Sequence, residues 1–543
     1  VHDRNVDKLL DEIQKFPEMR FCLDGSWIAQ SYLATRDTEA KQRFLNLARK
    51  GTIGVPVQLA NLMTGYPTLE ELIRSTSYSL HLHHRYGIPF DYANITDVPS
   101  YTWSYPSVLH ALGVKYLAAA SNNDRAPILL YGRWNEKSPF WWQGPDGSKV
   151  LMSYSRQYFQ LSFVCGVPAQ DAACRQSLPV FLQQYQAPTY KPDAVLMYGS
   201  QIENTDLIPG EPQFVKTWNQ KYAYPKIVLA TFPDYFHYID QHYGKELQTV
   251  TGDFGPYWED GFGTDAKIGI LARSNQQSAM SAEKLATIGS LVQKYVAGPR
   301  ANLRPTWEDI VLYSEHTFTS WGGYSRPRSD ETVRQFAYKD NHAVDARLRV
   351  NNILDVSFSQ LADQIHMPAP ALVVFNSLSW QRSGLVETDL DDGEALKEYP
   401  SMRVVPYEVL RRGSGYNHIR FLAQDVPSFG YKCYAIVEAP HTSRPSDQLP
   451  VSNVIENQYY RVEFDPSSGA IQSIYDKQLG RELVKPQGHY RFDQYLYVAG
   501  GDETATQIVY FRKALPFANL TISTSQNGSV TSIRRTPYGR ILT

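Results

Sequence analysis

Two short segments of this sequence carry side chains that could perform acid–base or metal chemistry. Asp97 follows an apolar run, Phe90–Ile95, that predicts a β-strand, and it precedes a predicted helix. Parallel-sheet enzymes place catalytic carboxylates in such positions. His316 follows Glu315 directly, and a neighbouring carboxylate can fix the tautomer of a metal-binding imidazole. Both residues also have structural explanations, because an aspartate can cap a helix and a lone histidine can be a satisfied core residue.

A third segment, Thr251–Asp265, gathers acidic residues among aromatic residues and glycines. The ring of Trp258 could stack on a sugar, and apolar surroundings raise the pKa of a carboxyl group toward that of a general acid. An acidic loop that caps the following helix would have the same composition. The candidate acids of this segment are Asp253, Glu259, Asp260 and Asp265.

Polar side chains also follow two other predicted strands. Asn122 and Asn123 come after the run Val114–Ala119, and Asp206 comes after the run Ala194–Tyr198. Each cluster alone is weak evidence, since loops are polar for ordinary reasons. Because the carboxyl ends of parallel strands meet at one edge, the clusters together predict a polar rim on the α/β part of the chain.

Secondary-structure elements must position these residues. Up to about residue 255, short apolar runs alternate with amphipathic stretches. This alternation predicts parallel βαβ units, in a barrel or in an open sheet. The predicted strands are Arg20–Leu23, Ile53–Leu59, Phe90–Ile95, Val114–Ala119, Pro127–Tyr131, Lys149–Tyr154, Ala194–Tyr198 and Lys226–Ala230. The predicted helices include Val6–Lys15, Glu39–Lys50, Leu69–Tyr86 and Gln213–Tyr222.

Two further parts follow the α/β part. Three amphipathic helices predict a helical bundle, and apolar residues such as Val344, Leu348 and Phe358 mark the third of them. After the linker Met367–Pro370, short β-type runs separated by turn signals predict an antiparallel sandwich. We therefore predict three domains over residues 1–260, 261–366 and 367–543.

Composition excludes several classes of protein. With 43% hydrophobic and 20% charged residues the chain is an ordinary globular one, and its net charge of −2 gives no basic field to attract nucleic acid. No apolar run is long enough for a transmembrane helix. The four cysteines form neither a metal motif nor a disulfide framework, so we expect buried or idle thiols. The compartment stays open, and a homo-oligomer is compatible with the sequence.

Taken together, these segments resemble glycoside hydrolase family 38, the α-mannosidases and their bacterial relatives. The most specific motifs lie in the predicted sandwich, where VVFNSLSW at 373–380, IENQYYRVE at 455–463 and SIYD at 473–476 resemble family signatures. Looser matches in the rest of the chain are Ala93–Thr102, Gly252–Gly261 and Glu315–Trp321. The resemblance spans nearly the whole chain and implies a (β/α)7-type barrel, a three-helix bundle and an antiparallel β-sandwich.

The resemblance also implies a reaction. A retaining glycosidase of this kind acts on α-mannosides or related α-glycosides and uses one divalent metal ion, which we expect to be Zn²⁺. The resemblance implies that Asp97 is the nucleophile and, with His316, a metal ligand. Asp260 is the best match for the general acid/base, with Glu259 and Asp265 as rivals.

The implied sugar contacts are less specific. Asn122 and Asn123 fall near a sugar-contacting position of the family, and Trp258 and Asp206 are the other candidates for substrate binding. The implied partner is therefore a carbohydrate, with no role for nucleic acid.

Two departures from the family keep other hypotheses open. The family's His-x-Asp ligand pair is missing, since His2-Asp3 has the wrong spacing, and we expect that a segment with the first barrel strand precedes this chain. Pro99-Ser100 replaces Phe-Gly after the nucleophile position, and Thr317 stands where many members have Asp. A non-catalytic carbohydrate-binding protein on the same scaffold is the second hypothesis. An unrelated transferase or lyase is the third.

Overall fold

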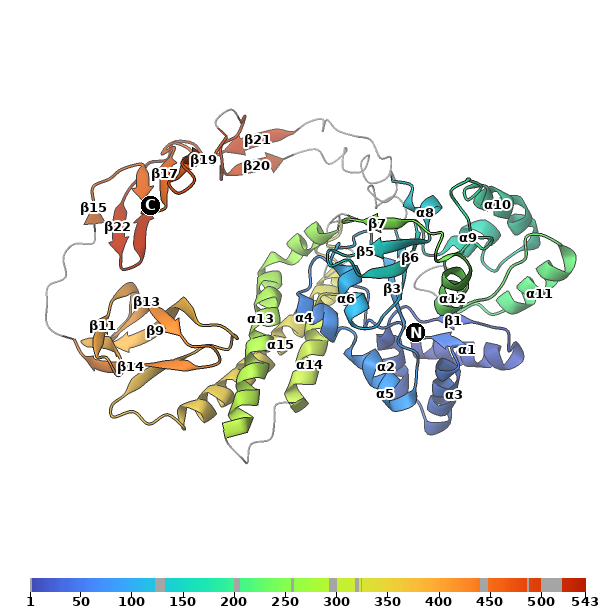
Figure 1. Cartoon of the computed structure of the whole chain (residues 1–543), viewed down its shortest axis with the longest axis horizontal. Helices are drawn as coiled ribbons and strands as arrows, with labels where there is room; N and C mark the ends of the chain where they lie inside the picture. The colour runs from blue at the N-terminus through green and yellow to red at the C-terminus, as the bar shows by residue number, and fades with distance from the viewer. Residues whose placement is uncertain are drawn as a thin grey trace. The chain divides into compact units, whose positions relative to one another are not determined.

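The structure is a computed structural model that describes residues 2–122, 132–199, 206–254, 258–292, 300–317, 322–323, 325–439, 448–485, 488–499 and 520–543 (Figure 1). The chain divides into two compact units. The first comprises Val1–Glu283 with Ala297–Leu354, and the second comprises Lys284–Val296 with Asp355–Thr543. We describe each unit by itself.

The first unit is an α/β unit with a long helical part. Its strands are β1 (Phe21–Cys22), β2 (Ile53–Gly54), β3 (Tyr92–Asp97), β4 (Tyr116–Ser121), β5 (Phe140–Gln143), β6 (Lys149–Ser155) and β7 (Thr249–Thr251). Its helices up to residue 243 are α1 (His2–Lys15), α2 (Ser26–Thr35), α3 (Thr38–Arg49), α4 (Leu69–Arg74), α5 (Ser77–Tyr86), α6 (Tyr105–Ala111), α8 (Trp134–Lys137), α9 (Gln160–Cys165), α10 (Asp171–Gln183), α11 (Glu211–Lys221) and α12 (Phe232–Tyr243).

The main sheet has the strand order β3-β4-β6-β5-β7. Strands β3, β4 and β6 are parallel, so the carboxyl ends of all three lie at one edge of the sheet. Strand β5 runs antiparallel to β6, which the prediction of purely parallel units missed. Strands β1 and β2 form a separate parallel pair, and the Val57 amide donates to the carbonyl of Tyr92, so the chain after β2 continues alongside β3.

Two predicted strands are irregular in the structure, and polar side chains explain why. The side chain of Gln160 accepts a hydrogen bond from the Tyr198 amide, and the Gln160 amide donates to the Tyr198 carbonyl. The side-chain amide of Asn219 donates to the Ile227 carbonyl and accepts from the Ile227 amide. These bonds replace the strand partners that the runs 194–198 and 226–230 would need. The predicted strand 127–131 lies outside the described residues.

The predicted helix over residues 69–86 is two helices, α4 and α5. The hydroxyl groups of Ser75 and Thr76 donate to the carbonyls of Leu72 and Ile73, and this local bonding marks the break between the helices. The 3₁₀ helix η2 (Glu259–Asp265) precedes three long helices, α13 (Ala266–Val292), α14 (Arg300–Tyr313) and α15 (Asp330–Ala362). Helix α14 lies in the first unit, whereas α13 and α15 both begin in the first unit and extend into the second.

The helices share one hydrophobic core with the main sheet. Val311 of α14 and Ala343 of α15 belong to the same buried cluster as Ile95 of β3 and Trp142 of β5. The buried face of α15 begins with small residues, Ala343 and Ala346, and continues with Val350 and Ile353. Of the apolar residues by which the sequence marked this helix, Leu361 is buried, Leu354 and Ile365 are half-buried, and Val344, Leu348 and Phe358 are exposed.

The second unit is rich in antiparallel strands. Its sheets are β11-β10-β14-β8, β12-β13-β9, β16-β17-β18-β19, β15-β22-β23 and β20-β21. The strands are β8 (Ala371–Phe375), β9 (Arg382–Asp391), β10 (Glu394–Glu398), β11 (Arg403–Val405), β12 (Tyr407–Arg412), β13 (Tyr416–Val426), β14 (Tyr431–Glu438), β15 (Gln448–Leu449), β16 (Val454–Glu456), β17 (Tyr460–Phe464), β18 (Ile471–Asp476), β19 (Arg481–Glu482), β20 (Leu496–Ala499), β21 (Thr521–Thr524), β22 (Ile533–Thr536) and β23 (Gly539–Leu542).

The first two of these sheets pack on each other as the sequence predicted. Leu396 of β10 and Tyr434 of β14 share one buried cluster with Ile419 and Phe421 of β13. Asn376 of the VVFN motif has a structural role, because its side-chain amide donates to the carbonyls of Trp380, Val426 and Pro427.

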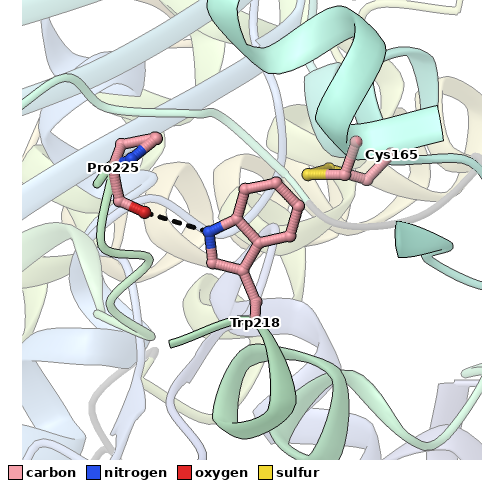
Figure 2. Close-up of a disulfide and its surroundings, with 4 residues drawn as sticks. Cys165, Trp218 and Pro225 are labelled. Atoms are coloured by element: carbon pink, nitrogen blue, oxygen red, sulfur yellow. Dashed lines mark hydrogen bonds between the residues drawn. A yellow bond between two sulfur atoms is a disulfide. The ribbon is translucent and has the colours of Figure 1, made fainter. Parts of the chain in front are cut away.

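The cysteine prediction is wrong for two of the four residues. Cys165 at the end of α9 and Cys174 in α10 form a disulfide nine residues apart (Figure 2). The sequence analysis missed it because a short local bridge needs no repeated cysteine pattern. Cys22 and Cys433 are free, and burial raises the pKa of the Cys22 thiol to about 12. Within the described part of the chain, no helix combines the length and apolar character needed to cross a membrane.

Candidate active site

Asp97 is the last residue of β3 and lies at the carboxyl edge of the main sheet. Its backbone has φ +73°, a left-handed conformation that is uncommon for a residue other than glycine and recurs at functional sites. Asn122, one residue past β4, holds it twice: its amide donates to the Asp97 carbonyl, and its side-chain Nδ2 donates to Oδ1 at 2.7 Å. One carboxylate oxygen is therefore engaged, and Oδ2 points elsewhere.

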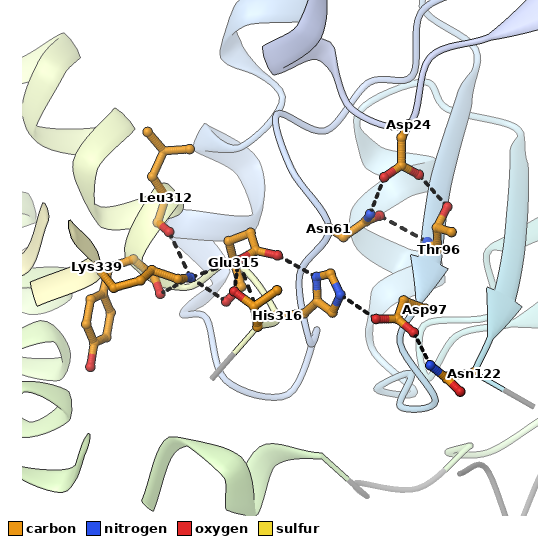
Figure 3. A network of polar contacts seen from close by, with 11 residues as sticks. Asp24, Asn61, Thr96, Asp97, Asn122, Leu312, Glu315, His316 and Lys339 are labelled. Atoms are coloured by element: carbon orange, nitrogen blue, oxygen red, sulfur yellow. Dashed lines mark hydrogen bonds and ion pairs between the residues drawn. The ribbon is translucent and has the colours of Figure 1, made fainter. Parts of the chain in front are cut away.

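Asp97 Oδ2 meets the imidazole of His316, 219 residues further along the chain (Figure 3). The distance from Oδ2 to His316 Nε2 is 2.9 Å. The other ring nitrogen, Nδ1, lies 2.6 Å from Oε1 of Glu315. The imidazole therefore sits between two carboxylates, one from the sheet edge and one from its own neighbour in sequence.

Lys339 of α15 completes the chain of charges. Its ammonium group lies 2.9 Å from Oε2 of Glu315 and donates to the carbonyls of Leu312, Tyr313 and Glu315. Only 8% of the Lys339 side chain is exposed. The carbonyls of Leu312 and Tyr313 belong to the last turn of α14, where a helix leaves carbonyls without intrahelical partners, so the lysine anchors that end as well as Glu315.

These contacts shift the acid–base equilibria of the cluster. Burial alone would raise the pKa of Glu315, but Lys339 and His316 outweigh burial and hold the pKa well below its usual range. Burial alone would lower the pKa of His316, but Glu315 and Asp97 outweigh it and raise the pKa to about 10. Without a metal ion, the imidazole therefore carries a proton at neutral pH.

Hydrogen bonds through Asn61 connect the end of β3, which carries Asp97, to the segment that carries His316. Leu62 and Glu315 form an isolated antiparallel bridge, and the His316 amide donates to the Asn61 carbonyl. The side chain of Asn61 accepts from the Thr96 amide and donates to Asp24. Thr96 and Asn61 thus share Asp24 as a hydrogen-bond acceptor, which fixes the end of β3 against the segment that carries His316.

The structure places Trp258 beside this cluster. Its ring is parallel to the His316 imidazole at a centroid distance of 6.3 Å, and its backbone amide donates to Ser100. Trp258 is a buried residue of the first unit's core. The sequence-predicted aromatic residue and the predicted metal ligand are therefore neighbours.

The three candidates for the general acid have different positions. The backbone of Asp260 lies in η2, and its side chain lies outside the described part of the structure. The carboxylate of Glu259 packs so close to Gly65 that a Cβ there would lie 2.9 Å from Oε1. Asp265 accepts from the Tyr313 hydroxyl at 3.3 Å, and burial and the nearby Asp265 carboxyl raise the pKa of Asp340 to about 7.

Two predicted substrate contacts are not part of the described cluster. Asp206 forms ion pairs with Arg4 and Lys8 of α1, at 2.5 and 3.0 Å. Asn123 lies outside the described residues. Sequence reasoning missed Lys339, because the stripe that it shares with Ala343 begins with small residues and is recognised as buried only in the structure.

The residues present fit a divalent metal ion as two of its ligands. Nε2 of His316 and Oδ2 of Asp97 face each other, and both are donor types that Zn²⁺ accepts. A carboxylate on the second nitrogen, as Glu315 provides, is the usual support of a metal-binding imidazole. Among the residues that the structure describes, no three His, Cys, Asp or Glu side chains gather to hold a metal ion. Asp97 and His316 could therefore supply two ligands, which is only part of a metal-ion ligand set.

The fold and the site define a class. An α/β enzyme with a carboxylate and an imidazole at the carboxyl edge of its parallel strands has the groups for metal-assisted chemistry on a polar substrate. Comparison with known proteins names the family. Residues 1–260 match the description "Glycosyl hydrolases family 38 N-terminal domain", and residues 455–503 match "Glycosyl hydrolases family 38 C-terminal domain". The chain belongs to glycoside hydrolase family 38, a family of glycosidases that includes the α-mannosidases.

Individual relatives agree with this membership. The chain is 25% identical to bovine (Bos taurus) lysosomal alpha-mannosidase over 115 residues, 21% of this chain and 11% of that protein. It is 22% identical to the human (Homo sapiens) lysosomal alpha-mannosidase over 186 residues, 32% of this chain and 17% of that protein.

Solved structures show the same fold. An alpha-mannosidase from Enterococcus faecalis V583 superposes with a TM-score of 0.67 at 17% identity, covering 92% of this chain and 63% of that one. A second Enterococcus faecalis protein of the family gives a TM-score of 0.61 at 17% identity, covering 92% and 62%. This chain therefore spans less than two thirds of the length of these structures and a small part of the curated relatives.

Proposed function

We propose that this chain is a metal-dependent, retaining glycoside hydrolase that acts on α-mannosides or related α-glycosides. The observation that carries the proposal is the 2.9 Å contact between Asp97 and His316 at the carboxyl edge of the sheet, in a chain of family 38. The names of the relatives favour mannosides as the substrate class.

In the proposed reaction, Asp97 attacks the anomeric carbon and forms a glycosyl-enzyme intermediate. The Asn122 side chain, which donates to Oδ1 of Asp97, would orient the carboxylate for this attack. A second carboxyl group donates a proton to the departing oxygen and later removes one from water. Two displacements at the same carbon retain the anomeric configuration, and the two carboxyl groups of such enzymes are about 5–5.5 Å apart.

Asp97 and His316 would hold the metal ion, which we propose is Zn²⁺. When bound, the ion would supply a template for the sugar hydroxyls that favours ring distortion toward the transition state. Glu315 and Lys339 keep the imidazole oriented for that role. Trp258 packs beside His316, where its ring could contact the sugar.

Asp260 remains the proposed general acid/base. Its backbone follows Trp258 by two residues in η2, which supports a position close to the His316 cluster. The rivals have partners of their own, since Glu259 packs on Gly65 and Asp265 lies beside Asp340. Asn123 and Asp206 stay proposed substrate contacts.

We propose the same domain division as the sequence analysis, with a (β/α)7-type barrel over residues 1–260, a helical bundle over 261–366 and a β-sandwich over 367–543. The order of α/β, helical and β-rich elements along the chain supports this division.

The experiment starts from Asp97→Asn, which preserves the shape of the side chain. We expect the variant to fold as the wild type does and to lose nearly all hydrolysis of 4-nitrophenyl α-mannoside. Asp11→Asn, at a carboxylate that is 63% exposed on α1, is the matched control and should keep full activity. A variant of Asp97 with half the wild-type rate would overturn the assignment.

Two further measurements separate the alternatives. Asp260→Ala should lose natural glycosides far more than aryl glycosides with good leaving groups, and the same comparison in Glu259→Ala and Asp265→Ala identifies the acid. Metal analysis of the purified protein, together with NMR of the first-formed anomer, tests metal dependence and retention. A protein with neither bound metal nor hydrolysis would be a non-catalytic carbohydrate-binding protein.

A further inference from the structure

A groove of about 480 Å³ lies between the end of β6 and the helices α9 and α10. Arg156 and Gln157, which follow β6, form one side of it. Phe163 of α9 and Gln176 and Val180 of α10 line it from the helices. Its volume is in the range of small-molecule sites, about 300–1,000 Å³.

The lining of the groove is amphipathic and neutral. Four glutamine side chains and a serine supply hydrogen-bonding groups. Arg156, the charged residue among the described residues of the lining, is paired with Glu136 at 2.5 Å and donates to Gln184 at 2.8 Å. Phe163 and Val180 are exposed apolar residues on the two helices, and the Phe163 side chain is 64% exposed. Amide groups beside an exposed aromatic ring suit a sugar, which has polar edges and apolar faces, better than an anion.

The two helices that line the groove are covalently joined. The disulfide between Cys165 of α9 and Cys174 of α10 connects them (Figure 2). Cys165 and Cys174 also belong to a buried cluster with Trp218, whose ring nitrogen donates to the Pro225 carbonyl. The groove is therefore held by a rigid base, as a binding site requires.

The sheet places the groove near Asp97. In the register of the parallel strands, Asp97 is opposite Ser121 of β4, and Ala120 is opposite Ser155 of β6. Two strand spacings, about 10 Å, thus separate the end of β3 from the end of β6, where the groove begins. Tyr198 connects the two places, because its backbone binds Gln160 of the groove and its hydroxyl contacts Thr96 beside Asp97.

We propose that this groove binds a second sugar unit of an oligosaccharide whose scissile residue lies at Asp97. The inference rests on the proposed function and extends it from single α-mannosides to α-linked oligosaccharides. Phe163 would stack on the apolar face of the second sugar, and the glutamine amides would bind its hydroxyl groups.

The test compares substrates of different length in the intact protein. The ratio of kcat/KM for α-linked mannotrioses to kcat/KM for 4-nitrophenyl α-mannoside is measured for the wild type, Phe163→Ala and Gln176→Ala. We expect Phe163→Ala to lower this ratio about five- to tenfold. Ile270→Ala, at an apolar α13 residue that is 74% exposed, is the matched control and should leave the ratio unchanged.

Calorimetric titration with mannotriose gives a second readout that does not need turnover. Weaker binding of mannotriose by Phe163→Ala than by the wild type supports the groove as a sugar site. If the wild type binds mannotriose in this way but hydrolyses neither substrate, the proposed function is refuted and the groove proposal still stands. A ratio and an affinity that are the same in the wild type, Phe163→Ala and Gln176→Ala would overturn the groove as a sugar site.

Discussion

Replacement of Lys339 by methionine removes one buried charge and keeps the apolar stem of the side chain. In the wild type, the ammonium group neutralises Glu315 and binds three backbone carbonyls near the end of α14. In Lys339→Met, the Glu315 carboxylate keeps only the His316 imidazole as a close cationic partner in the described cluster. The carbonyls at the end of α14 lose a donor at the same time.

The structure gives the size of the effect. Removal of one partner from a fully buried ion pair costs about 3–5 kcal/mol, because the remaining charge stays desolvated. The Lys339 side chain is 8% exposed, whereas that of Glu315 is 23% exposed, so water can partly solvate the carboxylate that is left. We therefore expect the free energy of unfolding of the first unit to fall by about 2–4 kcal/mol.

Urea denaturation followed by tryptophan fluorescence measures this loss. Lys339→Arg keeps the charge and should recover part of the stability, and Lys216→Met, at an exposed lysine of α11, is the control for the loss of a surface lysine. In folded Lys339→Met, the poorly oriented imidazole should lower kcat of the proposed hydrolysis more than it changes KM. An unfolding midpoint and a kcat equal to those of the wild type would refute the reasoning.

Two other predictions concern the same unit. Replacement of both Cys165 and Cys174 by serine should lower the free energy of unfolding by about 2.6 kcal/mol, the chain-entropy value for a link across nine residues, measured by urea denaturation. Burial raises the pKa of Glu71 to about 8, although hydrogen bonds from Ser314 and Gln276 and the charge of Arg273 act to lower it. Because the unfolded chain releases this proton above pH 4.5 and the folded chain keeps it, stability should fall between pH 4.5 and 8, by up to about 1.4 kcal/mol per unit, and Glu71→Gln should remove that part of the slope. Parallel pH profiles of the wild type and the variant would contradict the assignment.

Long apolar runs were the best guide to the fold. The runs that predicted strands at 90–95, 114–119 and 149–154 correspond to β3, β4 and β6, with ends that differ by a few residues. Strand β5 was missed, because its sequence Phe-Trp-Trp-Gln is too short to show a period. The irregular runs at 194–198 and 226–230 have strand-like composition, and only distant polar side chains decide against a strand there.

In the candidate site, too, contacts between neighbours in sequence could be predicted, whereas contacts between distant residues could not. The adjacency of Glu315 and His316 is visible in the sequence, and the structure confirms that the carboxylate contacts the imidazole. Only the resemblance to family 38 predicted that Asp97 and His316 lie in one site, because sequence spacing says nothing about two residues that are 219 positions apart. Lys339 could not be inferred from the motif, because it comes from another helix. The roles of Asp97, His316 and Asp260 in catalysis stay predictions.

Asn61 links the backbone beside Asp97 to the backbone of His316. The Asn61 carbonyl accepts the His316 amide, its side-chain oxygen accepts the Thr96 amide, and its side-chain nitrogen donates to Asp24. One residue thus fixes the backbone on both sides of the site. If the backbone of His316 moved away from Asp97, the hydrogen bond from the His316 amide to the Asn61 carbonyl would break. The site is therefore preorganised by polar contacts of the chain itself, so that a metal ion or a sugar would not have to supply the free energy of bringing these two residues together.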